Sequence, residues 1–519
     1  MVDRLLIMKF PIILFIIIFK LSPSLGSIPK IKDYSGHGGL CKIDESLSFE
    51  NDYPSCYILE EAMRRFLLRL RMKHIPTAYP LKEKCSISRI SVKISEGCNE
   101  EESKLWPSAS MNESYSLEID NGTINIYSEE IWGTLHAFET ILQMVYRGEH
   151  GQNQIYECRV KDSPRFTHRG VLIDTARHYL SIETIKNVTT AMSIVKMNVL
   201  HWHMTDDESF PYSSSIYPEL SSKGAYHPQE YVYERGEIDA LIEFARLRGI
   251  RVIVEFDTPG HTLSWGKGHS EILTGEEHEG PINPTSENIL TFLSSLFQEI
   301  LSVFHDEYLH LGGSAFDKHW WQEDEAIQEF MQQQGFDQDY NKLESYYFQQ
   351  LTEIIQNIAS DAQKTISPVV WDSVFVNGFR GDLNTIIQVL NNDDWKSVVE
   401  SITSAGYKVI NSACWSENHG DFSDYGEKAY YCEPSDFGGT DKEIELVIGG
   451  EVVIWGTYVD DINLLLELWP VITVAAERLW ADYAHDFQFF LIKLKMLYCQ
   501  IKVLGWKLKP FIGPGFCAP

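Results

Sequence analysis

From Arg169 onward the chain repeats one pattern, in which a short apolar run is followed by a stretch with helical spacing. In the clearest helical stretch Ile238, Leu241 and Ala245 share one face, and Gly249 stands where the helix should end. Eight such units predict an α/β fold, a (β/α)₈ TIM barrel over residues 164–519. The apolar runs are Gly170–Ile173, Val199–His203, Ile250–Val254, Tyr308–Leu311, Pro368–Trp371, Thr385–Val389, Lys408–Ser412 and Val452–Trp455.

The preceding residues, 27–163, mix two periodicities. Leu59–Leu70 carries a helical stripe of apolar positions, with arginines on the opposite side. Ile90–Ile94 and Thr123–Tyr127 instead alternate apolar and polar positions, as half-buried strands do. The mixture predicts a smaller α+β domain that precedes the barrel and ends near Asp162.

Residues 1–26 have the layout of a secretory signal peptide. Leu5–Phe19 is almost wholly apolar, Arg4 precedes it, and Ser24–Gly26 offers a small-x-small cleavage site. A membrane span needs about 20 apolar residues, so an uncleaved anchor is the weaker alternative. We expect the protein to enter the secretory pathway, toward the lysosome or the extracellular space, with no membrane span after cleavage.

Composition supports export and narrows the function. Apolar residues make up 44% and charged residues 23% of the chain, which is typical of a globular protein. The net charge of −30 argues against nucleic-acid binding, because phosphate backbones would be repelled. Nine cysteines without a C-x-x-C pair predict disulfides with at least one thiol left over. Three N-x-Ser/Thr sequons, at Asn112, Asn121 and Asn187, predict N-glycosylation.

Polar and aromatic side chains gather directly after the predicted strands, at the end where such barrels build active sites. The guanidinium of Arg177 could grip two adjacent hydroxyls or a carboxylate, although a structural pair with Asp174 explains the spacing equally well. Asp206 could fix the orientation of His261. The residues that follow strands are Asp174, Arg177, Asp206, Asp207, Asp257, His261, Trp371 and Trp455.

Two further patterns bear on the chemistry of this end. His201 and His203 share one face of a strand, but no third nitrogen or thiolate ligand stands out nearby, and we expect no metal. Trp371 and Trp455 close two later strands. Aromatic rings at a barrel mouth commonly support the apolar face of a sugar, although a core role is commoner for tryptophan in general. Together these residues indicate a carbohydrate site.

Several multi-residue blocks resemble the animal β-N-acetylhexosaminidases of glycoside hydrolase family 20, in the same order and from about Cys56 to Cys517. The resemblance implies an α+β domain before the barrel, a homodimer or a heterodimer with another hexosaminidase chain, and no cofactor. It also implies substrate-assisted removal of terminal N-acetylglucosamine or N-acetylgalactosamine from glycans. The blocks are Arg169–Tyr179, His201–Asp207, Glu255–Lys267, Gly280–Pro284, Leu309–Gly313, Asp436–Thr440 and Ala476–Trp480.

The resemblance breaks at the catalytic positions. The family's acid and its helper aspartate follow the fourth strand as Gly-Gly-Asp-Glu, and here that stretch reads Gly312-Gly313-Ser314-Ala315. Ala315 stands at the proton donor and Ser314 at the helper position. Further replacements are Ser416 for the tyrosine that holds the acetamido oxygen, Asn418 for a sugar-binding aspartate, Leu390 for a pocket tryptophan and Thr457 for a glutamate. The substrate-binding positions Arg177, Asp206, His261, Trp371 and Trp455 are kept.

The resemblance also implies the disulfides Cys56–Cys98 and Cys499–Cys517. A third family bridge, between the loop near Glu276 and position 319, lacks both of its cysteines here. Cys41 and Cys85 could form a substitute, and the pairing of Cys158, Cys414 and Cys432 stays open.

Three functions remain in view. The leading hypothesis is a family member that is inactive or severely impaired and keeps a role in glycan binding or as a subunit. The second is a working N-acetylhexosaminidase in which another carboxyl, from Asp317, Glu323, Asp372 or Glu417, reaches the leaving oxygen. The third is a purely structural partner of an active hexosaminidase chain.

Overall fold

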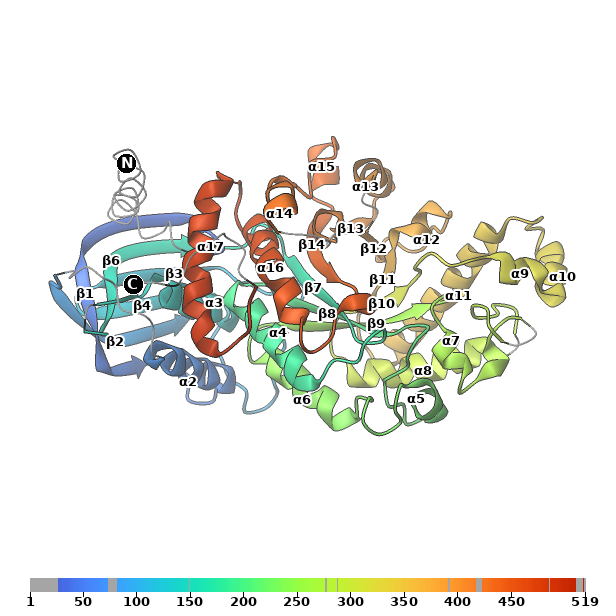
Figure 1. Ribbon diagram of the computed structural model, residues 1–519, viewed down its shortest axis with the longest axis horizontal. Helices are drawn as coiled ribbons and strands as arrows, with labels where there is room; N and C mark the ends of the chain where they lie inside the picture. Colours follow the sequence, from blue (N-terminus) through green and yellow to red (C-terminus); the bar gives the residue numbers. More distant parts are fainter. Residues whose placement is uncertain are drawn as a thin grey trace, which may run out of the picture.

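The structure, a computed structural model, describes residues 27–509 except 73–81, 149, 276–277, 287, 391–392, 417–421 and 485, together with Cys517. It places an amino-terminal sheet with its helices beside a larger barrel (Figure 1). The predicted signal peptide, Glu417 and Asn418 lie outside the described residues.

The amino-terminal unit is a six-stranded mixed sheet in the order β1-β2-β4-β3-β6-β5, and β1 also pairs with β6. Its apolar face packs on helices α2 (Tyr57–Arg71) and α3 (Ile131–Met144), which bury residues such as Phe66 and Phe138. The predicted helix and both predicted strands are present. The strands are β1 (Asp33–Glu50), β2 (Cys85–Ile94), β3 (Tyr115–Asp120), β4 (Thr123–Ser128), β5 (Tyr146–Arg147) and β6 (Asn153–Asp162).

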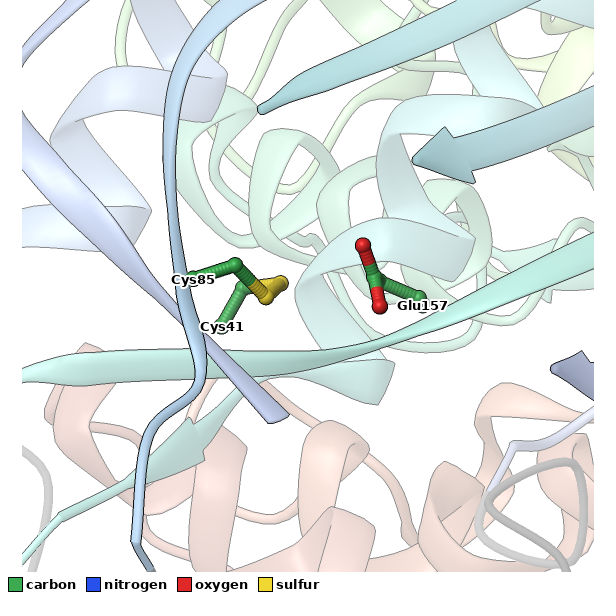
Figure 2. A group of neighbouring side chains, drawn as sticks. All are labelled: Cys41, Cys85 and Glu157. Atoms are coloured by element: carbon green, nitrogen blue, oxygen red, sulfur yellow. A yellow bond between two sulfur atoms is a disulfide. The ribbon is translucent and has the colours of Figure 1, made fainter. Parts of the chain in front are cut away.

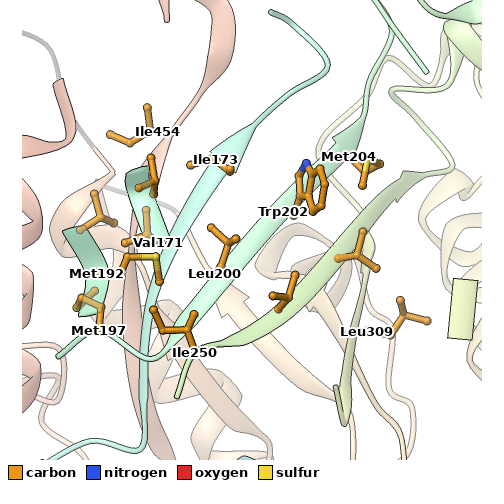
Figure 3. Close-up of a cluster of buried hydrophobic side chains, with 14 of the residues drawn as sticks. Val171, Ile173, Met192, Met197, Leu200, Trp202, Met204, Ile250, Leu309 and Ile454 are labelled. Atoms are coloured by element: carbon orange, nitrogen blue, oxygen red, sulfur yellow. The ribbon is translucent and has the colours of Figure 1, made fainter. Parts of the chain in front are cut away.

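The second unit is a closed barrel of eight parallel strands, which confirms the predicted fold. The strands read as continuous apolar runs because one face points into the barrel and the other lies under helices. Figure 3 shows part of this core, where Val171, Leu200 and Trp202 gather with Met192. The strands are β7 (His168–Asp174), β8 (Val199–Thr205), β9 (Arg251–Thr258), β10 (Tyr308–Gly312), β11 (Ser367–Trp371), β12 (Ile386–Val389), β13 (Lys408–Asn411) and β14 (Val447–Ile454).

Helices surround the barrel (Figure 1). In α6 (Arg235–Arg246) the predicted apolar face is buried, and a capping box between Glu234 and Glu237 starts the helix. The other helices after β7 are α4 (Ile182–Ile194), α5 (Glu219–Gly224), α7 (Leu263–Gly266), η2 (Ser270–Ile272), α8 (Ile289–Val303), α9 (His319–Glu323), α10 (Glu325–Gln334), α11 (Tyr340–Asp361), α12 (Asp372–Val376), α13 (Trp395–Ser404), η3 (Ala413–Trp415), α14 (Phe422–Tyr431), α15 (Asp441–Ile444), η4 (Gly456–Tyr458), α16 (Leu464–Trp480), α17 (Phe487–Ile501) and η5 (Lys502–Leu504). In the part of the chain that is described, none of the helices is both long and apolar enough to cross a membrane.

Four disulfides tie the chain together: Cys41–Cys85, Cys56–Cys98, Cys414–Cys432 and Cys499–Cys517. The first joins register partners on the neighbouring parallel strands β1 and β2, with their Cα atoms 4.4 Å apart. Figure 2 shows this bridge near the carboxylate of Glu157, which accepts a hydrogen bond from the Gly39 backbone. Sulfur atoms in a disulfide offer no thiolate to a metal ion. We therefore interpret Cys41, Cys85 and Glu157 as a structural cross-link with a neighbouring carboxylate and not as a metal site. The leftover thiol is the buried Cys158.

The first described residues are fixed between the two units. Ser27 is almost fully buried, and its carbonyl accepts a hydrogen bond from Lys493 Nζ. The Ile28 amide donates to Gln143 Oε1 at 2.8 Å. The chain therefore enters the fold at a buried point, directly after the predicted cleavage site.

Candidate active site

The carboxyl ends of the barrel strands bring the expected side chains together around Asp206, which follows β8. Arg177 Nη2 lies 2.7 Å from Asp206 Oδ2, and Arg177 Nη1 lies 2.9 Å from Asp174 Oδ2. The guanidinium also stands 5.0 Å from the ring of Trp455. The structural pair with Asp174 therefore exists. Because the Arg177 side chain remains 18% exposed, the geometry also leaves it facing the mouth of the barrel.

His261 is oriented by Asp206, as the sequence predicted. Its Nδ1 lies 3.0 Å from Asp206 Oδ1, and the residue adopts the left-handed backbone angle φ 61°. Burial alone would lower the pKa of His261, but the hydrogen bond to Asp206 and the charges of Asp257 and Asp207 outweigh it and raise this pKa to about 9. His261 is thus an imidazolium at neutral and acidic pH, held at the mouth by a carboxylate.

A chain of histidines and carboxylates continues from Asp206 into the barrel. Asp206 Oδ2 lies 2.8 Å from His203 Nε2, and His203 Nδ1 lies 2.6 Å from Glu255 Oε2. Glu255 and Glu451 both face His201, at 3.2 and 2.9 Å. Burial opposes the charge on Glu255, yet the neighbouring histidines hold its pKa well below the usual range. Both nitrogens of His201 and of His203 thus face carboxylates.

The loop after β10 rests on Asp257. The Gly313 and Ser314 amides donate to Asp257 Oδ1 at 2.8 and 3.2 Å, and Gly312 takes φ 78°. Burial raises the pKa of Asp257 to about 6. Ser314 is half-buried, whereas Ala315 is exposed and its carbonyl lies 3.4 Å from His261 Nε2. The backbone carbonyl of Ala315 therefore meets the imidazole, and an exposed alanine stands at this point of the mouth.

Of the alternative acids, Asp317 and Asp372 have contacts of their own. Asp317 is 72% exposed and lies 2.8 Å from His319. Asp372 is buried and accepts the Leu390 amide at 3.2 Å. Glu323 is exposed at the end of α9. The buried Asp257 has a pKa high enough to carry a proton in acid, but it is only 1% exposed.

The two tryptophans differ in exposure. Trp371 is 2% exposed and donates through Nε1 to Glu255 Oε1 at 2.6 Å, so it forms the floor of the site. Trp455 is half-buried, its ring 6.0 Å from that of Trp371, and Leu390 packs against the same cluster. Ser416 follows η3 beyond the end of β13, and Thr457 is exposed in η4.

Comparisons with known proteins agree with this geometry. Residues 166–483 match the model of the glycosyl hydrolase family 20 catalytic domain, and residues 28–144 match a beta-acetyl hexosaminidase like domain. The chain belongs to glycosyl hydrolase family 20. The reaction of this family is glycoside hydrolysis.

Relatives of this family 20 chain include beta-hexosaminidase subunit beta of Homo sapiens, 39% identical over 89% of this chain and 83% of the relative. Beta-hexosaminidase subunit alpha of Rattus norvegicus is 40% identical over 89% and 88%. Among solved structures, a Flavobacterium johnsoniae chitobiase superposes with a TM-score of 0.79 at 21% identity, covering 93% of this chain and 73% of its own. At that identity the likeness shows the fold alone.

The sequence identified the residues at the mouth of this family 20 site but missed much of what supports them. Glu255, Glu451, His168 and His310 line the barrel interior, and sequence reasoning gave them no role. The signal for Glu255 was the alternation along β9, where every second residue points inward, whereas His168, His310 and Glu451 lie on β7, β10 and β14.

The sequons of the family 20 chain differ in accessibility. Asn121 is exposed in the turn between β3 and β4. Asn112 and Asn187 are half-buried, and Asn187 Oδ1 accepts a hydrogen bond from the Trp506 indole at 3.2 Å. A glycan is accommodated most simply at Asn121.

Proposed function

We propose that this family 20 chain is inactive or severely impaired as an N-acetylhexosaminidase and acts by binding, either to N-acetylhexosamine-containing glycans or to a second hexosaminidase chain. The observation that carries the proposal is Ala315, an exposed methyl group at the family's proton-donor position. A positioned general acid contributes about 10²–10⁴-fold in rate, and a methyl group has no proton to give.

The neighbouring replacements support the same conclusion. Ser314 stands in place of the helper carboxylate and carries no charge to stabilise a developing oxazolinium. Leu390 packs on the Trp371 cluster where the family has a third tryptophan. Arg177, Asp206, His261 and Trp455 still form a polar mouth with one aromatic wall, so weak sugar binding is the activity that these contacts favour.

The decisive assay compares the wild-type protein with the double variant Ser314→Asp/Ala315→Glu on a chitobiose-type substrate and an aryl N-acetylhexosaminide near pH 4–5. We expect the wild type to cleave neither substrate, because the acetamido anchors are lost together with the acid. Wild-type cleavage of chitobiose within about tenfold of an active relative would contradict the proposal. The variant Asp317→Asn tests for a relocated acid. If the wild type has residual activity and this variant loses it, Asp317 is the group that protonates the leaving oxygen.

A subunit role is the second candidate, and the names of the relatives favour it, since they are described as subunits alpha and beta of beta-hexosaminidase. Co-expression with an active hexosaminidase chain, followed by size-exclusion chromatography, tests it. A heterodimer is the expected result if this chain is a subunit, and a monomer under both conditions counts against it.

We also propose a secretory-pathway location, lysosomal or extracellular. Four disulfides support it, because such bonds persist in oxidising compartments. Expression of the full chain in animal cells should give a protein that begins near Ser27. Its apparent mass should fall on treatment with an N-glycanase, which removes N-linked glycans. A product that retains residues 1–26 and resists the enzyme would refute this location.

A further inference from the structure

Two half-buried arginines stand at the junction of the amino-terminal unit and the barrel, and each donates to a backbone carbonyl rather than to a carboxylate. Arg65, on α2, donates Nη2 to the Leu247 carbonyl at 2.7 Å. Arg248, just after α6, donates Nη1 to the Phe244 carbonyl at 2.9 Å and stacks 3.4 Å from the Phe244 ring. Each guanidinium has five N–H donors, so most of them remain unused in these contacts.

The nearby carboxylates are committed to other arginines. Glu61 binds Arg64 at 2.7 Å, and Glu139 binds Arg69. Within the described residues, neither Arg65 nor Arg248 forms an ion pair. The positive charges of Arg65 and Arg248 are therefore not compensated by a paired carboxylate, although the net charge of the chain is −30.

Both arginines line one small cavity of about 30 Å³, which is open to solvent on one side. Its walls come from α2, α3, α4 and the turn after α6, and Phe66, Leu135 and Phe138 contribute their apolar part. The rest of the lining is Ala62, His136, Glu139, Leu142 and Ser193. The rings and aliphatic side chains in the lining reduce the water around the arginines, which strengthens their attraction to an anion.

The electrostatics of the two arginines agree with this geometry. Burial, which is the larger effect, and the positive charge of Arg65 together lower the pKa of Arg248 to about 9. Burial likewise lowers the pKa of Arg65 to about 10. Two cations that repel one another across a partly desolvated cavity are stabilised by an anion placed between them.

We propose that this cavity binds a tetrahedral oxyanion of the sulfate or phosphate class, held by Arg65 and Arg248 across the junction of the two units. A doubly charged anion neutralises both cations at once, and the planar guanidinium fork matches two of its oxygens. Sulfate keeps both charges in acid, whereas phosphate loses one near pH 6 to 7. The site therefore favours sulfate over phosphate at pH 5, and the preference shrinks at pH 7.5.

The test is thermal unfolding of the full chain during titration with sodium sulfate, at constant ionic strength balanced with chloride. Wild type should show a saturable rise in Tm, and Arg248→Gln should weaken the apparent affinity at least about tenfold. Arg71→Gln is the matched control, because Arg71 is exposed on the last turn of the same helix α2 as Arg65. Phenyl sulfate in place of sulfate distinguishes a free ion from a terminal ester group.

Two outcomes would overturn the site. One is a linear, unsaturated rise in Tm that is equal in all variants, which is the general stabilising effect of sulfate. The other is an equal loss of affinity in Arg71→Gln. If Arg248→Gln does not fold, Arg248→Lys provides the same test, because a single point charge should retain only part of the affinity. Full sulfate affinity in a folded Arg248→Lys would also contradict the proposal.

Discussion

The carboxylate of Asp206 and the imidazole of His261 stand 3.0 Å apart at the mouth of the barrel, and the second oxygen of Asp206 reaches inward to His203. This pair marks the outer end of the chain of histidines and carboxylates that fills the barrel. Its ionisation couples the mouth to the interior, because each charged group lies within contact distance of the next.

Stability should therefore depend on pH with a predictable sign. The pKa values of His261 and His201 are raised to about 9, above the ordinary 6.5. Their protonated forms stabilise the fold fully below pH 6.5, and this contribution is lost as the pH rises through 9. We expect the free energy of unfolding to fall by at least about 1 kcal/mol between pH 6.5 and 9. Urea denaturation across this range, with His261→Gln as the comparison, measures it.

His261→Gln should flatten this pH dependence, because it removes one of the two titrating groups. An unchanged slope in the variant, or a wild type that gains stability toward pH 9, would contradict the coupling. At the acid end Asp206 and Glu451, whose pKa values are lowered, act in the opposite direction below about pH 4.

The two tryptophans of the site should separate binding from stability. Trp371→Ala empties a buried position and should cost about 3–5 kcal/mol of unfolding free energy. Trp455→Ala removes a half-buried ring next to Arg177. It should lower the free energy of unfolding less than Trp371→Ala does, and it should weaken the affinity for N-acetylglucosamine more. Calorimetric titration and thermal unfolding of both variants measure the difference. A Trp455→Ala protein with unchanged affinity would exclude the sugar pocket.

Gly312 is required by its backbone angle and by Asp257. A Cβ at this position would lie 2.0 Å from Asp257 Oδ1, and φ is 78°. Gly312→Ala should destabilise the fold by about 2 kcal/mol or more. Gly335 takes a similar φ of 69° in open space at the end of α10, so Gly335→Ala should cost only about 1 kcal/mol. Equal losses in chemical denaturation would show that contact with Asp257 adds nothing.

The bridge between β1 and β2 should carry measurable stability. Cys41 and Cys85 are 44 residues apart in sequence, and replacing both with alanine should cost about 2–4 kcal/mol. Guanidinium denaturation of the double variant, under non-reducing conditions, checks the loss. The alanine variant of the buried, unpaired Cys158 is the control that retains all four bridges. A double variant as stable as wild type would mean that the bridge is dispensable.

The barrel was predictable because each strand keeps an apolar face under the helices and leaves a short run rich in apolar residues. The mouth was predictable because the carboxyl ends of those strands converge, which brought Arg177, Asp206 and His261 together. The interior network was not, since His168 and Glu451 are far apart in sequence and meet only when the barrel closes. The burial of Trp371 depends on its contact with Glu255, and the Cys41–Cys85 pair depends on strand register. Neither can be read from spacing.

The burial of Ser27 between the two units affects how the protein can be produced. A fusion partner joined directly to this residue would begin inside the fold, where the Lys493 side chain holds the backbone. An expression vector for a chain that begins at Ser27 therefore needs a protease site that leaves Ser27 as the first residue. The alternative is a spacer between the fusion partner and Ser27 that is long enough to reach the surface.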